Sequence, residues 1–239
     1  MTEKVRPRIR PQLITFDFGD TLVTSTPSYL ERIALGLTEI GFPCRAQDVE
    51  AAFHRSDLKH SAQMLAQAPF DNATFQTGFA ETLFEELKLS GDEAELYEKL
   101  ARWLLDFRPK RMLMPGAGEL LDALKRRGYR LGVISNNDGN TRPKCAAVDI
   151  EKYFEFILDS TLEGVMKPDG RIFAKALQLG GASAEKTVHV GDLWGCDILG
   201  AHAAGLWAAW LSNPYVSPDP VDRVFTIEKL LDLLEILPS

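Results

Sequence analysis

The chain lacks long apolar runs and has few cysteines. No stretch approaches the ~20 consecutive apolar residues of a membrane-spanning helix, and the N-terminus lacks the apolar region of a secretory signal. Cys44, Cys145 and Cys196 are odd in number and show no Cys-x-x-Cys spacing, which argues against a disulfide framework and against a zinc site. These absences predict a cytoplasmic protein without a membrane partner.

Excess positive charge is also missing. Lysine and arginine number 27 against 34 aspartates and glutamates, which gives a formal charge of −7 and argues against nucleic acid as the main partner. Basic residues cluster in the first ten positions, and we interpret this segment as a solvated tail: Lys4, Arg6, Arg8 and Arg10. Gly116-Ala117-Gly118 lacks the third glycine of a dinucleotide-binding loop, so no dinucleotide site is expected.

The length of 239 residues exceeds that of most compact domains, so we expect one domain with a large insertion or two domains. From about Tyr29 to Leu105 the apolar residues recur at helical spacing, and strand signals are absent. Turn signals between these helices occur at residues 41–43, 68–72 and 90–92. This part of the chain therefore predicts a helical bundle.

After Arg108-Pro109 the pattern alternates between strands and helices. The expected strands cover residues 129–134, 156–158, 187–190 and 206–211. The expected helices cover residues 119–127, 172–179, 198–204 and 227–237. With the apolar run at 13–16, this alternation predicts an α/β fold, a Rossmann-like parallel sheet core with an inserted α-helical cap domain. The core would comprise residues 1–24 and 110–239, and the cap residues 25–109.

A carboxylate directly follows the first expected strand, in the segment Asp17-Phe18-Gly19-Asp20-Thr21. Ligands of open α/β sheets bind at the carboxyl ends of the strands, so Asp17 is the first candidate for chemistry. Three later motifs also present polar groups, namely Ser135, Lys167 before Pro168-Asp169, and Asp192 with Asp197 after Gly191. Each group alone would suit a turn or a helix cap, but the ordered set indicates one site.

These four motifs resemble, in the same order, those of the haloacid dehalogenase superfamily. The resemblance implies that Asp17 is a nucleophile that forms an aspartyl-phosphate. It implies that Lys167 offsets negative charge and that Ser135 hydrogen-bonds a phosphoryl oxygen, with Asn136 as a further substrate-binding residue. The expected function is therefore hydrolysis of a small-molecule phosphate ester.

The resemblance also implies a Mg²⁺ site. Asp17, Asp192 and the backbone carbonyl of Gly19 would supply the hard oxygen ligands that this ion prefers. Asp197 would hold a metal-bound water or orient Lys167.

The first motif departs from the family pattern at one position. Phosphatases of the superfamily usually carry Asp-x-Asp-Gly-Thr, whereas Gly19 and Asp20 occupy the third and fourth positions here. The missing aspartate ordinarily protonates the leaving alcohol and activates water, a role worth ~10²–10⁴-fold in rate. Gly19 would therefore attenuate the reaction unless Asp20, one residue further, serves as the catalytic acid–base group.

The spacing of the motifs locates the insertion. Asp17 and Ser135 are 118 positions apart, far more than one crossover needs, whereas Ser135 and Lys167 are only 32 positions apart. The helical segment thus follows the first strand and resembles the C1-type cap of subfamily I. Such a cap would close over the site, exclude water and contribute to selectivity.

Other functions remain open. A 2-haloacid dehalogenase uses the same nucleophile and also lacks the second aspartate of the first motif, but it works without metal and does not keep an acidic ligand such as Asp192. This charge argument favours a phosphatase. A phosphonatase would need a cap lysine for a Schiff base, for which Lys59 is the candidate. A non-catalytic binding or regulatory protein on the same scaffold is supported by Gly19 alone.

Overall fold

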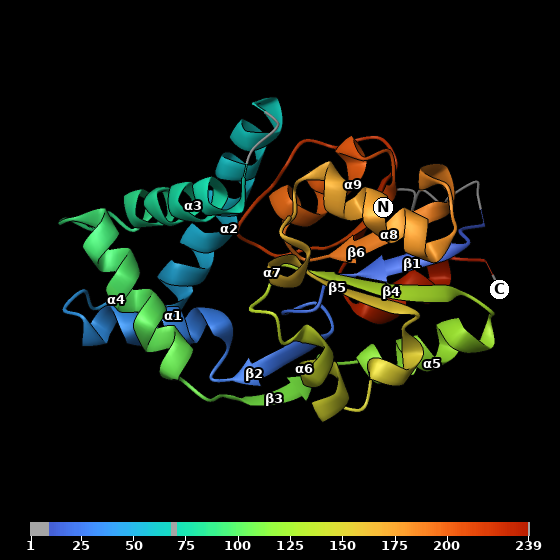
Figure 1. Ribbon diagram of the computed structural model, residues 1–239, viewed down its shortest axis with the longest axis horizontal. Helices are drawn as coiled ribbons and strands as arrows, with labels where there is room; N and C mark the ends of the chain where they lie inside the picture. The colour runs from blue at the N-terminus through green and yellow to red at the C-terminus, as the bar shows by residue number, and fades with distance from the viewer. Residues whose placement is uncertain (1–9, 68–70, 239) are drawn as a thin grey trace.

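The computed structural model describes residues 10–67 and 71–238 (Figure 1). Lys4, Arg6 and Arg8 of the expected tail lie outside the described residues, as does part of the expected turn at 68–72. Within these ranges the three cysteines carry free thiols. No helix in the described part of the chain combines the length and apolar character needed to cross a bilayer.

A six-stranded parallel sheet forms the centre of the described chain. Its strands run in the order β5 (Phe156–Asp159), β4 (Arg130–Ser135), β1 (Leu13–Phe16), β6 (Thr187–Gly191), β7 (Trp207–Leu211) and β8 (Val224–Ile227). Every neighbouring pair is parallel. The predicted α/β class with a Rossmann-like sheet is confirmed.

Helices cover both faces of this sheet because both faces are apolar. All four residues of β1 are buried, as expected for a parallel strand covered on both sides. One face packs against α5 (Ala117–Arg126) and α10 (Leu233–Ile236), and the other against α8 (Gly170–Gly180) and α9 (Gly200–Ala203) (Figure 1). The shorter helices α6 (Thr141–Ala147) and α7 (Ser160–Glu163) follow β4 and β5.

The predicted helical region from 29 to 105 is confirmed. It contains α1 (Tyr29–Glu39), α2 (Ala46–Ala66), α3 (Asn72–Glu86) and α4 (Glu93–Asp106). These helices share an apolar cluster of their own, which includes Ile33, Leu37, Val49, Phe84 and Leu100. The helical insert lies beside the sheet in Figure 1, and α2 is its main contact with the core.

A two-stranded antiparallel ribbon, which the sequence did not predict, joins the insert to the core. It pairs β2 (Val23–Thr26) with β3 (Lys110–Leu113). Each strand has four residues, of which only Val23 is buried, so neither shows the apolar pattern of a buried strand. Strand β2 of the ribbon therefore lies between β1 and the first helix of the insert.

The helix predicted over residues 227–237 is wrong in its first part. Ile227 ends β8, because Phe225 and Ile227 alternate toward the buried side and pair with β7. The helical part is confined to a 3-10 turn at Leu230–Asp232 and to α10. The helix expected at 198–204 begins earlier, as a π-helical segment η3 (Trp194–Leu199), and continues as α9.

Candidate active site at the carboxyl edge of the sheet

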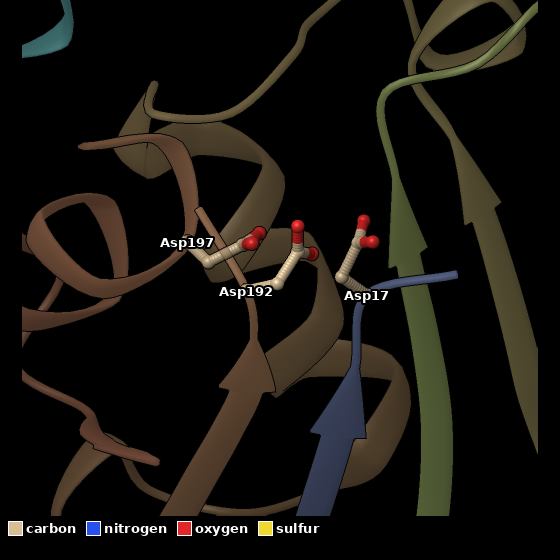
Figure 2. Close-up of side chains that lie close together, drawn as sticks. All are labelled: Asp17, Asp192 and Asp197. Atoms are coloured by element: carbon tan, nitrogen blue, oxygen red, sulfur yellow. The ribbon is translucent and has the colours of Figure 1, made fainter. Parts of the chain in front are cut away.

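Acidic side chains meet at one edge of the sheet because β1 and β6 are adjacent parallel strands. Asp17 directly follows β1, Asp192 directly follows β6, and Asp197 lies in η3. Figure 2 shows the three side chains converging beyond the strand ends. Carboxylate oxygens of all three lie within 4.8 Å of one another. The fold thus brings together the expected nucleophile and the expected acidic metal ligands.

Lys167 lies between two of these carboxylates. Its Nζ donates to Asp17 Oδ1 at 2.5 Å and to Asp197 Oδ1 at 2.6 Å. The residue is only 2% exposed, so an unpaired ammonium would be costly there. Although burial opposes the shift, Asp17 and Asp197 raise the pKa of Lys167 above its ordinary value. Lys167 is therefore a cation held against Asp17.

Asp197 is completely buried and supports Lys167 from behind. Its Oδ1 lies 3.3 Å from Nε2 of His189, and its Oδ2 accepts the backbone N–H of Leu193 at 3.0 Å. Burial acts against ionisation, but Lys167 and His189 lower the pKa of Asp197 to about 2. Gly191 leaves room for the Asp197 side chain, since a Cβ at position 191 would lie 2.3 Å from Asp197 Cγ. Orientation of Lys167 is one of the two roles expected of Asp197.

Asp17 and Asp192 are adjacent acidic side chains whose joint ionisation the surrounding protein opposes. Burial raises the pKa of Asp17 to about 7, even though Lys167 opposes the shift. Burial, then Asp17 and Asp197, raise the pKa of Asp192 well above its ordinary value. Asp192 Oδ1 accepts a hydrogen bond from the neutral hydroxyl of Thr21 at 2.8 Å. Two adjacent carboxylates of this kind fit a hard divalent cation such as Mg²⁺, which would favour their ionised forms.

The expected phosphate-binding residues come from β4, which adjoins β1 on its other side. Ser135 ends this strand, is 2% exposed and accepts a hydrogen bond from the Asn137 side chain at 3.3 Å. The Asn136 amide makes two hydrogen bonds with the main chain of Lys167, at 2.8 and 2.9 Å. Asn136 therefore fixes the Lys167 backbone beside β4, and substrate contact by Ser135 and Asn136 stays a prediction.

Comparison with known proteins agrees with this arrangement. The family described as haloacid dehalogenase-like hydrolase matches residues 11–205. The chain belongs to this family. The prediction of a haloacid dehalogenase-like hydrolase, and so of an enzyme, is confirmed.

Two curated relatives match this hydrolase over nearly their whole lengths. Haloacid dehalogenase-like hydrolase domain-containing protein 3 of Homo sapiens is 28% identical over 238 residues, which cover 97% of this chain and 94% of the relative. Phosphoserine phosphatase of Thermus thermophilus is 29% identical over 233 residues, with 87% and 94% covered. The crystal structure of the HAD-hydrolase YfnB from Bacillus subtilis, bound to magnesium, has the same fold, with a TM-score of 0.66, 24% identity and 97% and 100% coverage.

Gly19 of this hydrolase occupies an exposed position in the turn after Asp17. The N–H of Val23 closes the turn by donating to the Phe18 carbonyl at 2.9 Å, and Gly19 forms an isolated bridge with Val23. A Cβ built on Gly19 meets no heavy atom within 4 Å outside its chain neighbours. Packing therefore does not require glycine, and metal contact by the Gly19 carbonyl stays a prediction.

Asp20 is directed toward the ribbon. Its backbone has a φ of 53°, and its carboxylate accepts the Thr24 hydroxyl at 2.7 Å. Burial raises the pKa of Asp20, and its charge contributes to the raised pKa of Asp192. Asp20 thus lies within electrostatic range of the site, and its acid–base role stays a prediction.

Two residues of the helical insert differ in their relation to the site. Lys59, the expected Schiff-base candidate, has a 46% exposed side chain that pairs with Glu85 at 3.0 Å on the outer surface. Asp57, which the sequence analysis missed, is completely buried and contacts the backbone of η3. No sequence signal distinguishes Asp57 from the other charged residues of α2, whereas Thr21 belongs to the first motif and was recognisable there.

Proposed function

We propose that this hydrolase is a Mg²⁺-dependent phosphatase that cleaves a small phosphate ester through an aspartyl-phosphate on Asp17. The proposal rests above all on the carboxylates of Asp17, which is buried, and of Asp192, which is half-buried. Both lie at one edge of the sheet together with the ammonium group of Lys167. Asp192 adds repulsion between the ionised carboxylates that a further cation would offset. The relative described as phosphoserine phosphatase supports the same reaction class.

The contacts of Asp17, Lys167 and Ser135 support a role for each group. Asp17 would attack phosphorus with a carboxylate oxygen while the bond from phosphorus to the ester oxygen breaks and the leaving alcohol takes up a proton from water, since Gly19 has none to give. Lys167 would offset the gathered negative charge, and the Ser135 hydroxyl would donate to a phosphoryl oxygen. Water would then attack phosphorus, release inorganic phosphate and restore the Asp17 carboxylate. Mg²⁺ held by Asp17 and Asp192 would supply additional positive charge.

The turn at Gly19 would make this phosphatase a slow one for alkyl esters. Glycine cannot protonate the leaving alcohol, and Asp20 hydrogen-bonds Thr24. Aryl phosphates need little protonation, so they would be hydrolysed relatively better than alkyl phosphates.

The helical insert would act as the cap of this site. We retain the division into a core of residues 1–24 and 110–239 and a cap of residues 25–109, with the ribbon of β2 and β3 at the junction. A cap that closes over Asp17 would exclude water from the first step and select the substrate.

A 2-haloacid dehalogenase is the second candidate, because Gly19 matches the absence of a second aspartate in that class. Its nucleophile would also be Asp17. Asp192 argues against it, since a metal-free reaction gains nothing from a second, half-buried carboxylate beside the nucleophile.

A substrate panel with matched variants separates the two functions. The purified protein would be assayed on alkyl and aryl phosphates with Mg²⁺ and with chelator, and on 2-chloropropionate. We expect phosphate release only with Mg²⁺, and its loss in Asp192→Asn with the fold retained by circular dichroism. Chloride release without metal, or full phosphatase activity of Asp192→Asn in chelator, would contradict the proposal.

A further inference from the structure

Asp57 is a buried carboxylate of the helical insert that accepts hydrogen bonds from the backbone of residues 192–197, which we call the acidic loop. Its Oδ2 accepts the Gly195 N–H at 2.5 Å, and its Oδ1 accepts the Cys196 N–H at 2.9 Å. The Ser61 hydroxyl, one turn further along α2, donates to Oδ1 at 3.3 Å. Three hydrogen bonds therefore satisfy a side chain with no exposed surface.

These N–H groups belong to the first turn of η3, where a helix leaves its donors without internal partners. The residue at the N-cap position is Leu193, whose side chain cannot accept a hydrogen bond. Asp57 supplies the missing acceptor from 138 positions away in the chain. A carboxylate at this end also suits the positive pole of the helical peptide dipoles.

The close approach of α2 to the loop depends on Gly195. A Cβ at this position would lie 2.3 Å from the Asp57 carbonyl oxygen and 2.5 Å from Ser61 Cβ. Such distances cannot be relieved by rotating a side chain, because one of the two atoms belongs to the backbone. The contact between insert and loop thus depends on a residue from each, Asp57 of α2 and Gly195 of the loop.

The acidic loop, residues 192–197, places one carboxylate of the candidate site at each of its ends. Asp192 begins it beside Asp17, and Asp197 ends it against Lys167. The two N–H groups that Asp57 binds immediately precede Asp197 in the chain. A shift of this turn would move Asp197 and, through its hydrogen bond, Lys167.

We propose that Asp57 is a positioning residue through which the helical insert holds the acidic loop, and with it Lys167 and the metal-binding carboxylates, in the active arrangement. The catalytic meaning of this role rests on the proposed function. The structural part, that Asp57 holds the loop, does not depend on which reaction is catalysed.

A second anchor between α2 and the core allows docking to be separated from positioning. The Tyr215 hydroxyl donates to Glu50 Oε2 at 2.8 Å, and the His54 ring stacks on Tyr215 with centroids 5.6 Å apart. This anchor attaches the insert without touching the acidic loop. Tyr215→Phe removes the hydrogen bond to Glu50, so we expect it to weaken docking of the insert without removing a hydrogen bond from the acidic loop.

The test compares Asp57→Ala and the isosteric Asp57→Asn with Tyr215→Phe and Asp48→Asn. Asp48 lies on the same helix, and its side chain pairs with Arg45. Backbone hydrogen exchange of residues 193–199 and binding of Mn²⁺ as a Mg²⁺ probe would be measured first, followed by kcat and KM on an aryl phosphate. Hydrogen exchange and Mn²⁺ binding require no turnover, so they report on Asp57 even if the protein is not a phosphatase.

We expect exchange in residues 193–199 to accelerate about 10-fold or more in Asp57→Ala, while the strands of the sheet stay protected. Mn²⁺ affinity and kcat should fall by ~10–100-fold, the usual effect of removing a group behind the metal ligands. Asp57→Asn should show a smaller change, because its single carbonyl oxygen can accept one of the two N–H groups. Tyr215→Phe and Asp48→Asn should leave exchange in this segment unchanged.

Wild-type exchange and Mn²⁺ affinity in both Asp57 variants would overturn the proposal. An equal effect of Tyr215→Phe would overturn it as well, because docking alone would then explain the result. If Asp57→Ala does not fold, Asp57→Asn decides between these outcomes. Altered exchange and Mn²⁺ binding without phosphatase activity in the wild type would retain the positioning role and reject the proposed function.

Discussion

Helices α8 and α2 both pack against the core of the protein, but they bury different kinds of surface. The buried residues of α8 are Ile172, Phe173, Ala176 and Gly180. Those of α2 include five polar ones, namely His54, Ser56, Asp57, His60 and Ser61. The apolar face of α8 continues the core on one side of the sheet. Toward the core, α2 combines hydrogen bonds of Asp57 and His54 with apolar contacts of Leu58 and Met64, whereas His60 faces α3.

This difference suggests that α8 stabilises the sheet, whereas α2 attaches an insert that can change its position. Apolar burial of the kind made by α8 stabilises the sheet whatever the state of the site. Interfaces between units that move are typically more polar, because their groups must also be tolerated in water. The reacting groups would then lie at the carboxyl edge of the stable sheet. The insert would be attached by separate contacts, each of which can break without the others.

The largest expected effect removes the chemistry and leaves both interfaces intact. Asp17→Asn should lower turnover by about 10⁴-fold or more, since no other group would form the covalent intermediate. The melting temperature should not fall much, because the substitution removes a buried acidic group beside Asp192 while Asp197 still pairs with Lys167. Steady-state assays with thermal melts check this result, and turnover within 10-fold of wild type would show that Asp17 is not the nucleophile.

The next effect restores a group at the core edge. Gly19→Asp should raise the hydrolysis of alkyl phosphates by about 10²-fold and change aryl phosphates less, because general acid assistance is worth ~10²–10⁴-fold. The open space around Gly19 accommodates the new side chain. The alkyl-to-aryl rate ratio is the measurement.

Asp20→Ala is the matched control for that ratio. If the wild type hydrolyses alkyl phosphates efficiently and Asp20→Ala abolishes this activity, Asp20 is the acid–base group. Our interpretation of Gly19 as an attenuating substitution would then be wrong.

A truncation in α8 tests the apolar side of the comparison. Phe173 is fully buried against the sheet, and Phe173→Ala should cost about 3–5 kcal/mol in the free energy of unfolding. Leu179→Ala on the same helix, at a side chain 48% exposed, should change it little. Denaturant unfolding measures both, and similar costs for the two variants would contradict the assigned faces.

The polar side of the comparison predicts a pH dependence. Burial lowers the pKa of His54 from 6.5 to about 4. Between these values the unfolded chain binds a proton that the folded protein does not, so folding loses stability as the pH falls from 6.5 toward 4, on the order of 3 kcal/mol. Burial raises the pKa of Asp57 to about 6, which acts in the opposite direction over a similar range.

The substitution His54→Gln separates the contribution of His54 to the pH dependence of the unfolding free energy from that of Asp57. The difference in unfolding free energy between wild type and His54→Gln should be constant above pH 7. Below pH 6.5 it should shift progressively in favour of the variant. A difference that stays constant down to pH 4 would show that His54 is not buried in its neutral form.

The core and most of the site were predictable because their signals are local. Asp17 and Ser135 each follow an apolar strand, and parallel strands bring such residues to one edge. Lys167 and Asp192 were placed by the family resemblance, and the structure brings them to the same edge. The approach of Asp197 to Lys167 was one of two expected roles.

The missed features depend on contacts between distant parts of the chain. The ribbon pairs two strands of four residues each, for example Thr24 with Met112, and neither strand shows an alternating apolar pattern of its own. Ile227 belongs to a strand because it pairs with Leu211, although its spacing also suits the helix that follows. Asp57 gains its role only from the loop that α2 meets in the folded protein, so nothing in its own segment predicts it.

The central claim is that Asp17 accepts a phosphoryl group in a site completed by Mg²⁺. Beryllofluoride mimics a phosphoryl group on a carboxylate, and its bound fluorines can be followed by fluorine nuclear magnetic resonance. We predict bound signals with the wild type only when Mg²⁺ is present, and none with Asp17→Asn or Asp192→Asn. Signals that persist in Asp17→Asn, or the absence of any Mg²⁺-dependent adduct on the wild type, would contradict the account.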